Sequence, residues 1–133
     1  MMNLKNDLIN ETELRRALSI IHDGLFEIRA LKKSPKRTLS GYFRDVDTAV
    51  TALMSNSINL QGFNVYMTLN AIRPECYDRS QKDRMTIPEV TTNDDVIIGY
   101  NWLFVDLDPV RAADISSSDE QINKAKSMAK RIL

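Results

Sequence analysis

A nearly continuous hydrophobic run at residues 102–108 (WLFVDLD) is interrupted only by two carboxylates, Asp106 and Asp108, near its C-terminal end. Apolar runs of roughly four to eight residues are typical of strands that are buried on both faces of a sheet. The run therefore predicts a strand in the middle of a sheet, and a fold able to cover both of its faces.

Helical periodicity and capping patterns predict three helices along the chain. The first is expected over about 11–22, after a capping box at residues 10–13. The second is expected to be capped by Asp45 or Asp47. The third follows another capping box at 117–120 and is expected to run to the last residue.

Alternating apolar and polar residues predict strands at about 25–30 and 63–69, with an extended path at 40–43. Residues 71–93 show neither period and contain two prolines, which predicts a long irregular connection. Helices and strands in this order imply a mixed α/β or α+β fold. We expect residues 1–133 to form a single domain, with the first ten residues flexible.

Composition excludes several classes of protein. The chain has 133 residues with one cysteine, Cys76, and one histidine, His22. These counts exclude an internal disulfide, a cysteine-based zinc site and a His-rich metal site, and they favour a reducing compartment. The N-terminus lacks the apolar core of a signal peptide, and no apolar run reaches the roughly 18–20 residues that span a bilayer. We therefore expect a cytoplasmic protein without a membrane partner.

Charge is unevenly distributed although 18 basic residues balance 18 acidic ones. Residues 29–37 (RALKKSPKR) carry five basic residues and no acid, whereas residues 94–120 carry seven acids and one base. A phosphate-rich ligand with a metal would suit this pattern, but charge alone favours two solvated surfaces, because segregation of surface charge is common. The basic residues that could contact DNA phosphates are Arg29, Lys32, Lys33, Lys36 and Arg37, with Arg79 in the long connection.

Asp106 and Asp108 are two apart on the predicted strand, so both carboxylates project from one face and can share a cation. Mg²⁺ is typically held by one or two carboxylates together with waters and phosphate oxygens. The spacing therefore indicates a metal-nucleotide site at the carboxyl end of a strand, where open sheets place their ligands. The alternative is a turn, because Asp-Pro commonly starts turns and Asp106 could accept backbone hydrogen bonds.

The string WLFVDLDPVR at 102–111, followed by DISSSDE at 114–120, resembles the first catalytic motif of the archaeo-eukaryotic primase superfamily. The likeness is greatest to the N-terminal primase-polymerase domains of phage and plasmid replication proteins, and it covers about residues 25–133. Four upstream blocks are also similar to the family's and stand in the same order: FEIRA at 26–30, SGYF at 40–43, NVYMTLN at 64–70 and TNDDVI at 92–97.

The resemblance implies template-directed nucleotidyl transfer from nucleoside triphosphates on DNA, with Asp106 and Asp108 as catalytic ligands of Mg²⁺ or Mn²⁺. It also implies an RRM-like palm, of which this chain would hold the first strand and helix, and a downstream helicase domain or protein. Asn70 could contact the nucleotide or hold a loop. Arg111 could contact phosphate or pair with a neighbouring carboxylate. Tyr66 and Trp102 could stack on bases, but we expect both to be packed in the interior.

The family's second motif, Ser-x-His, and its third, an acidic residue, have no counterpart in the sequence. His22 does not substitute, because it lies upstream on the first predicted helix and follows two isoleucines. We therefore expect an N-terminal fragment or a truncated gene product that is inactive alone. One alternative is a non-catalytic module with the same fold that binds DNA or a replication partner through the basic loop. Another is a different D-x-D enzyme, such as a sugar-nucleotide transferase.

Overall fold

The computed structural model of the chain describes residues 9–55 and 59–132. The chain divides into two compact units, the first extending to Trp102 and the second beginning at Leu103. The predicted flexibility of the first ten residues falls mostly on residues 1–8, which lie outside the described residues. Each unit has its own secondary structure, and the mixed α+β class predicted from the sequence is confirmed.

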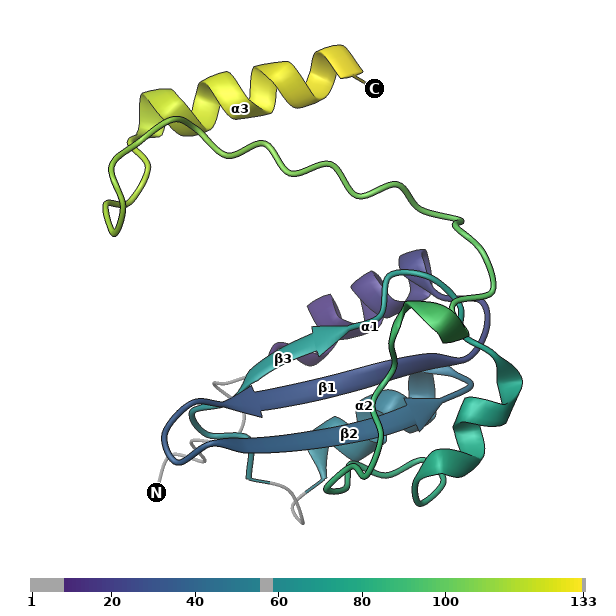
Figure 1. Cartoon of the computed structure of the whole chain (residues 1–133). Coiled ribbons are helices and arrows are strands. Elements are labelled where there is room, and N and C mark those ends of the chain that lie inside the picture. The colour runs from purple at the N-terminus through teal and green to yellow at the C-terminus, as the bar shows by residue number, and fades with distance from the viewer. Residues whose placement is uncertain (1–8, 56–58, 133) are drawn as a thin grey trace. The chain divides into compact units, whose positions relative to one another are not determined.

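The first unit is built on a three-stranded antiparallel sheet with strand order β2-β1-β3 (Figure 1). The strands are β1 (Phe26–Lys32), β2 (Arg37–Phe43) and β3 (Asn64–Met67). In the central strand, Phe26 lies opposite Phe43 of β2, and Ile28 lies opposite Met67 of β3. The strands predicted at about 25–30 and 63–69 are confirmed. β2 is longer than the extended stretch expected at 40–43, because it pairs with β1 along its whole length, from Arg37 to Phe43.

Helices α1 (Glu11–Ile21) and α2 (Val46–Met54) lie on one face of this sheet (Figure 1). The side-chain oxygen of Asn10, Oδ1, accepts a hydrogen bond from the backbone N–H of Glu13 at 3.0 Å. This bond caps α1 as predicted. Of the two acids considered for α2, Asp45 is the cap: its carboxylate accepts from the backbone N–H of Thr48 at 2.8 Å.

The main core lies between the sheet and the two helices, because alternate strand residues point toward the helices. Burying each large apolar side chain contributes roughly 1.5–3 kcal/mol. The buried strand and helix residues of this main core include Leu18, Phe26, Ile28, Ala30, Leu39, Phe43, Ala49, Val50 and Leu53.

A second, smaller cluster packs around Tyr42, which points from β2 to the opposite face of the sheet. It includes Ile72, Cys76 and Val96 from the segment between β3 and Leu103, which we call the long connection; its part at 71–93 is irregular as predicted. Two short 3₁₀ helices, η1 (Pro74–Arg79) and η2 (Asp94–Val96), interrupt this connection. The connection thereby covers part of the sheet face that α1 and α2 leave open.

The central strand predicted over 102–108 is not formed in the structure, so that prediction was wrong. The segment is irregular, and the side chains of Leu103, Phe104 and Val105 are 88%, 74% and 50% exposed. Hydrophobicity alone does not make a strand, because a buried strand needs hydrogen-bonded neighbours on both sides. Among the described residues, no strand pairs with this segment. The RRM-like palm implied by the resemblance stays a prediction.

The second unit contains helix α3 (Asp119–Ile132), which confirms the third predicted helix; the last residue, Leu133, to which the helix was expected to run, lies outside the described residues. Its capping box is one residue later than expected: the Ser118 hydroxyl accepts from the backbone N–H of Gln121 at 3.3 Å, and the Gln121 side chain accepts from the Ser118 N–H at 2.9 Å. None of the residues of α3 is buried. In the described parts of the chain, no helix is both long and apolar enough to cross a membrane.

Candidate functional site

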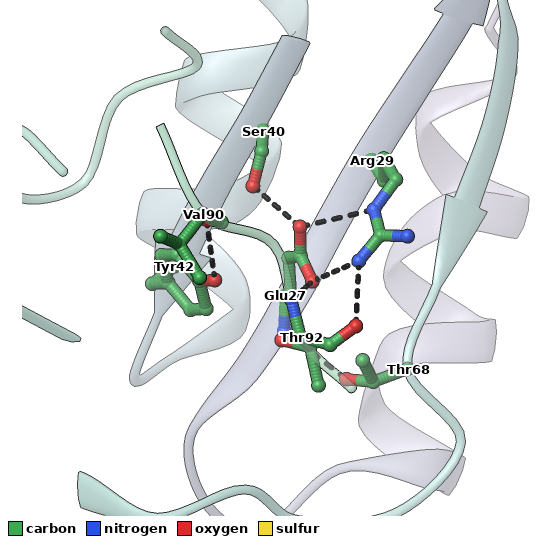
Figure 2. Close-up of polar contacts among 7 residues, drawn as sticks. All are labelled: Glu27, Arg29, Ser40, Tyr42, Thr68, Val90 and Thr92. Carbon is green, nitrogen blue, oxygen red and sulfur yellow. Dashed lines mark hydrogen bonds and ion pairs between the residues drawn. The ribbon is translucent and has the colours of Figure 1, made fainter. Parts of the chain in front are cut away.

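The sheet face opposite α1 and α2 carries a cluster of polar side chains (Figure 2). We call it the Glu27 cluster and define it as Glu27, Arg29, Ser40 and Thr92. Glu27 and Arg29 are two apart on β1 and so share a face, and Ser40 of β2 lies opposite Arg29. Thr92 comes from the long connection, so the cluster joins three of the sequence blocks described above.

Both carboxylate oxygens of Glu27 are fully used within the cluster, and its side chain is only 1% exposed. Oε1 accepts hydrogen bonds from the Ser40 hydroxyl and from Arg29 Nε at 3.1 Å. Oε2 accepts from Arg29 Nη2 at 2.8 Å and from the backbone N–H of Thr92 at 3.0 Å. Arg29 Nη2 also donates to the Thr92 carbonyl oxygen at 3.1 Å, so the ion pair connects β1 to the connection.

Burial raises the pKa of Glu27, but the hydrogen bonds from Arg29, Ser40 and Thr92 outweigh it and lower the pKa below its ordinary value. The hydrogen bond to Glu27 is also the main reason why the pKa of Arg29 is raised. The cluster is therefore a charged pair at neutral pH. Because its carboxylate has no spare lone pair, Glu27 positions the chain and is not available as a base or a metal ligand.

A cavity of about 380 Å³ lies beside the Glu27 cluster, over the β1–β3 side of the sheet. We call it the sheet-face cavity. Its walls include Leu31, Tyr66, Thr92 and Tyr100, and they draw on the blocks FEIRA, NVYMTLN and TNDDVI. Small-molecule sites typically measure about 300–1,000 Å³, so the cavity is large enough for a ring-sized ligand.

Tyr66 and Trp102 are 54% and 41% exposed, so the expectation that both pack in the interior was wrong. Tyr66 points away from the helices because its neighbour Val65 pairs with the core residue Ala30. Trp102 is attached by its indole N–H, which donates to the Ile21 carbonyl oxygen at 3.0 Å. The alternation in β3 could have revealed the exposure of Tyr66, whereas no sequence signal reports that the sheet lacks a covering layer there.

Asn70 is 8% exposed and uses both ends of its amide on the backbone before Leu103. Its Oδ1 accepts from the backbone N–H groups of Asn101 at 2.8 Å and Trp102 at 3.0 Å. Its Nδ2 donates to the Trp102 carbonyl oxygen at 3.5 Å. Of the two roles considered for Asn70, these hydrogen bonds match the one in which it holds a loop. Its contact with a nucleotide stays a prediction.

Asp106 and Asp108 lie in the irregular segment of the second unit, and both are exposed. The Asp108 carboxylate pairs with Arg111 Nη1 at 2.8 Å, and Arg111 Nε donates to the Ile115 carbonyl oxygen at 2.9 Å. Across residues 9–55 and 59–132, no three His, Cys, Asp or Glu side chains form a group that could hold a metal ion. Oxygen donors suit Mg²⁺ or Mn²⁺, but two exposed carboxylates need further ligands from a substrate phosphate and water.

Four of the predicted DNA contacts lie together at the turn of the β1–β2 hairpin. We call Lys32, Lys33, Lys36 and Arg37 the basic hairpin; all but the partly buried Lys32 are exposed. Arg29 stands apart from them, since it is half-buried in the Glu27 cluster. Arg79 ends η1, where a hydrogen bond with Tyr42 raises its pKa.

Comparison of the chain with models of protein families, with curated proteins and with solved structures finds no match. The interpretation of function therefore depends on the sequence blocks and on the geometry of the two units.

Proposed function

We propose that this chain is the part of a DNA primase-polymerase domain that carries the D-x-D motif. The activity would be metal-dependent, template-directed nucleotidyl transfer in the replication of a phage, plasmid or other mobile element in the cytoplasm. One observation supports the proposal: the four upstream family-like blocks, although far apart in sequence, contribute residues to one sheet face around the Glu27 cluster and its cavity. A downstream helicase domain or protein is the partner that the proposal adds.

In this proposal Asp106 and Asp108 hold Mg²⁺ or Mn²⁺ together with the phosphates of a nucleoside triphosphate. Both carboxylates are exposed, so a triphosphate can reach them. A bound divalent ion supplies stabilisation of the charge that develops at the transferred phosphoryl group. Arg111, which now pairs with Asp108 at 2.8 Å, can turn to a phosphate when the carboxylate takes up a cation. The Ser-x-His and third acidic motifs would have to come from outside these 133 residues.

Primer synthesis on a single-stranded DNA template tests the proposal. A chain that also carries the Ser-x-His and third acidic motifs, supplied with nucleotides and Mg²⁺ or Mn²⁺, is expected to make primers, and the 133-residue chain alone is expected to make none. Asp106→Ala together with Asp108→Ala should abolish synthesis. The matched control is Asp119→Asn with Glu120→Gln, which removes two exposed acids from the same unit. Synthesis that survives the first pair of changes would refute the assignment.

A second candidate is a non-catalytic module that binds single-stranded DNA, and the exposed basic hairpin favours it. Binding would then be independent of divalent ions and would weaken with salt, with a slope of roughly 0.7 per phosphate contact. Replacing the four basic residues by glutamine should abolish binding and lower this slope. Such binding, with no synthesis by any form of the protein, would favour the non-catalytic binding module over the polymerase.

A further inference from the structure

We propose that the sheet-face cavity binds one unpaired base of single-stranded DNA, with the ring of Tyr66 stacked on the base. This inference rests on the proposed function for the class of ligand, and it names the surface that the template's bases use. It does not involve Asp106 or Asp108, so the two proposals can fail separately.

The aromatic side chains of the cavity supply the stacking surface. Tyr66 lies on β3 opposite Arg29 and is 54% exposed on the face that the helices do not cover. Tyr100, from the end of the connection, also lines the cavity and is 83% exposed. Exposed aromatic rings on an open sheet are a common platform for unpaired bases, and each stacked base contributes about 1–3 kcal/mol.

Polar atoms in the wall are available to the edge of a base. Thr92 lines the cavity, and its hydroxyl oxygen, which is buried, has no hydrogen-bond partner within the described part of the chain. Buried polar atoms are rarely left without a partner, and rotation of the Thr92 side chain toward the cavity would let this hydroxyl bond the edge of a base. The carboxylate of Glu27 is already saturated, so it shapes the wall and does not bind the base.

Positive charge continues from the cavity along the hairpin. Leu31 lines the cavity, and Lys33 and Lys36 are exposed in the turn that follows β1 a few residues later. Arg29 uses Nε and Nη2 within the Glu27 cluster, and in Figure 2 its third guanidinium nitrogen makes no contact with the residues drawn. A strand whose base enters the cavity can therefore place its phosphates beside these cations. An uncharged small molecule would leave this charge unused, which favours a nucleic acid strand.

Binding of a short fluorescein-labelled single-stranded oligodeoxynucleotide to the 133-residue chain, followed by anisotropy in EDTA, tests the inference. Tyr66→Ala is expected to weaken binding about fivefold or more, which corresponds to the loss of one stacked base. Tyr66→Phe keeps the ring and should bind within about twofold of the wild type. The matched control is Val65→Ala on the same strand, which points to the other face and should also leave binding unchanged.

A second measurement does not depend on any variant. An oligodeoxynucleotide that carries 5-bromodeoxyuridine is irradiated with the wild-type chain, and the crosslinked peptide is identified by mass spectrometry. Crosslinks at Tyr66 or Tyr100 would support the inference. Crosslinks confined to the basic hairpin, or equal affinity for Tyr66→Ala and the wild type, would overturn it.

The two proposals give different patterns in these assays. Binding that depends on Tyr66, without synthesis by any form of the protein, would uphold the base site and remove the polymerase. Synthesis that depends on Asp106 and Asp108, together with DNA binding that is unchanged in Tyr66→Ala, would uphold the polymerase and overturn the base site.

Discussion

At the scale of single residues, Glu27 shows how one buried charge can organise a surface. It is an acid inside a strand, and the structure satisfies it with donors from Arg29, Ser40 and the backbone of Thr92. The nearest of these donors in sequence, Arg29, belongs to the same strand, whereas Thr92 is 65 residues away. The cluster therefore holds the long connection against the sheet beside the cavity, and it should contribute to stability as well as to shape.

Replacing Glu27 by glutamine should destabilise the fold by about 1–3 kcal/mol at pH 7, because Arg29 then loses its charged partner and the amide group faces other donors. Chemical unfolding in urea measures this change. The control is Glu13→Gln, whose carboxylate is 59% exposed and pairs with Arg16 on the helix surface. That change should alter stability by less than about 0.5 kcal/mol. Equal effects for the two variants would contradict the role assigned to Glu27.

The same residue gives the fold a dependence on pH whose sign follows from its lowered pKa. Because the pKa of Glu27 is lower in the folded than in the unfolded chain, the ionised group stabilises the fold above its unfolded value of about 4.5. This stabilisation is lost as the pH falls through the lower folded pKa. The stability difference between wild type and Glu27→Gln should therefore shrink from pH 7 to pH 3. A constant difference over that range would show that the carboxylate is not the titrating group.

At the scale of elements, local patterns predicted what local forces determine. The caps Asn10 and Asp45 and the alternation in β1 and β3 were readable because helix starts and strand faces depend on neighbours in sequence. The segment 102–108 was predicted wrongly because its hydrophobicity shows a need for burial and does not show which strands are present to pair with it. The Glu27 cluster and the cavity were missed because they depend on contacts between distant segments.

The close packing of the long connection on β2 gives a prediction at this scale. A Cβ atom at Gly41 would lie 2.6 Å from the Arg84 carbonyl oxygen and 2.9 Å from the Met85 sulfur. Gly41→Ala should therefore destabilise the fold by about 1–3 kcal/mol through overpacking. At Gly99 a Cβ meets nothing within 4 Å, so Gly99→Ala should have little effect. Thermal unfolding of both variants tests this, and equal midpoints would mean that the connection is not packed on β2 as described.

At the scale of the whole molecule, the two units differ in what stabilises them. Every buried hydrophobic residue found among the described residues belongs to the first unit, and α3 buries none of its side chains. Helix α3 has a capping box and an ion pair between Lys124 and Glu120, at 3.1 Å, but these are weak surface contributions. An isolated helix of 14 residues is marginal in water. The stability of the chain should therefore belong almost entirely to residues before Leu103.

A chain that ends at Trp102 should therefore unfold within about 3 °C of the 133-residue chain, which corresponds to less than about 1 kcal/mol for a domain of this size. Circular dichroism would follow both melts, and hydrogen exchange on the longer chain should show fast exchange in residues 103–133 and slow exchange in β1. Loss of several residues from the hairpin, by contrast, would remove part of the sheet and lower the midpoint strongly. A large drop in the midpoint after truncation at Trp102 would show that the second unit stabilises the first, since the core of the first unit would then depend on contacts with residues 103–133.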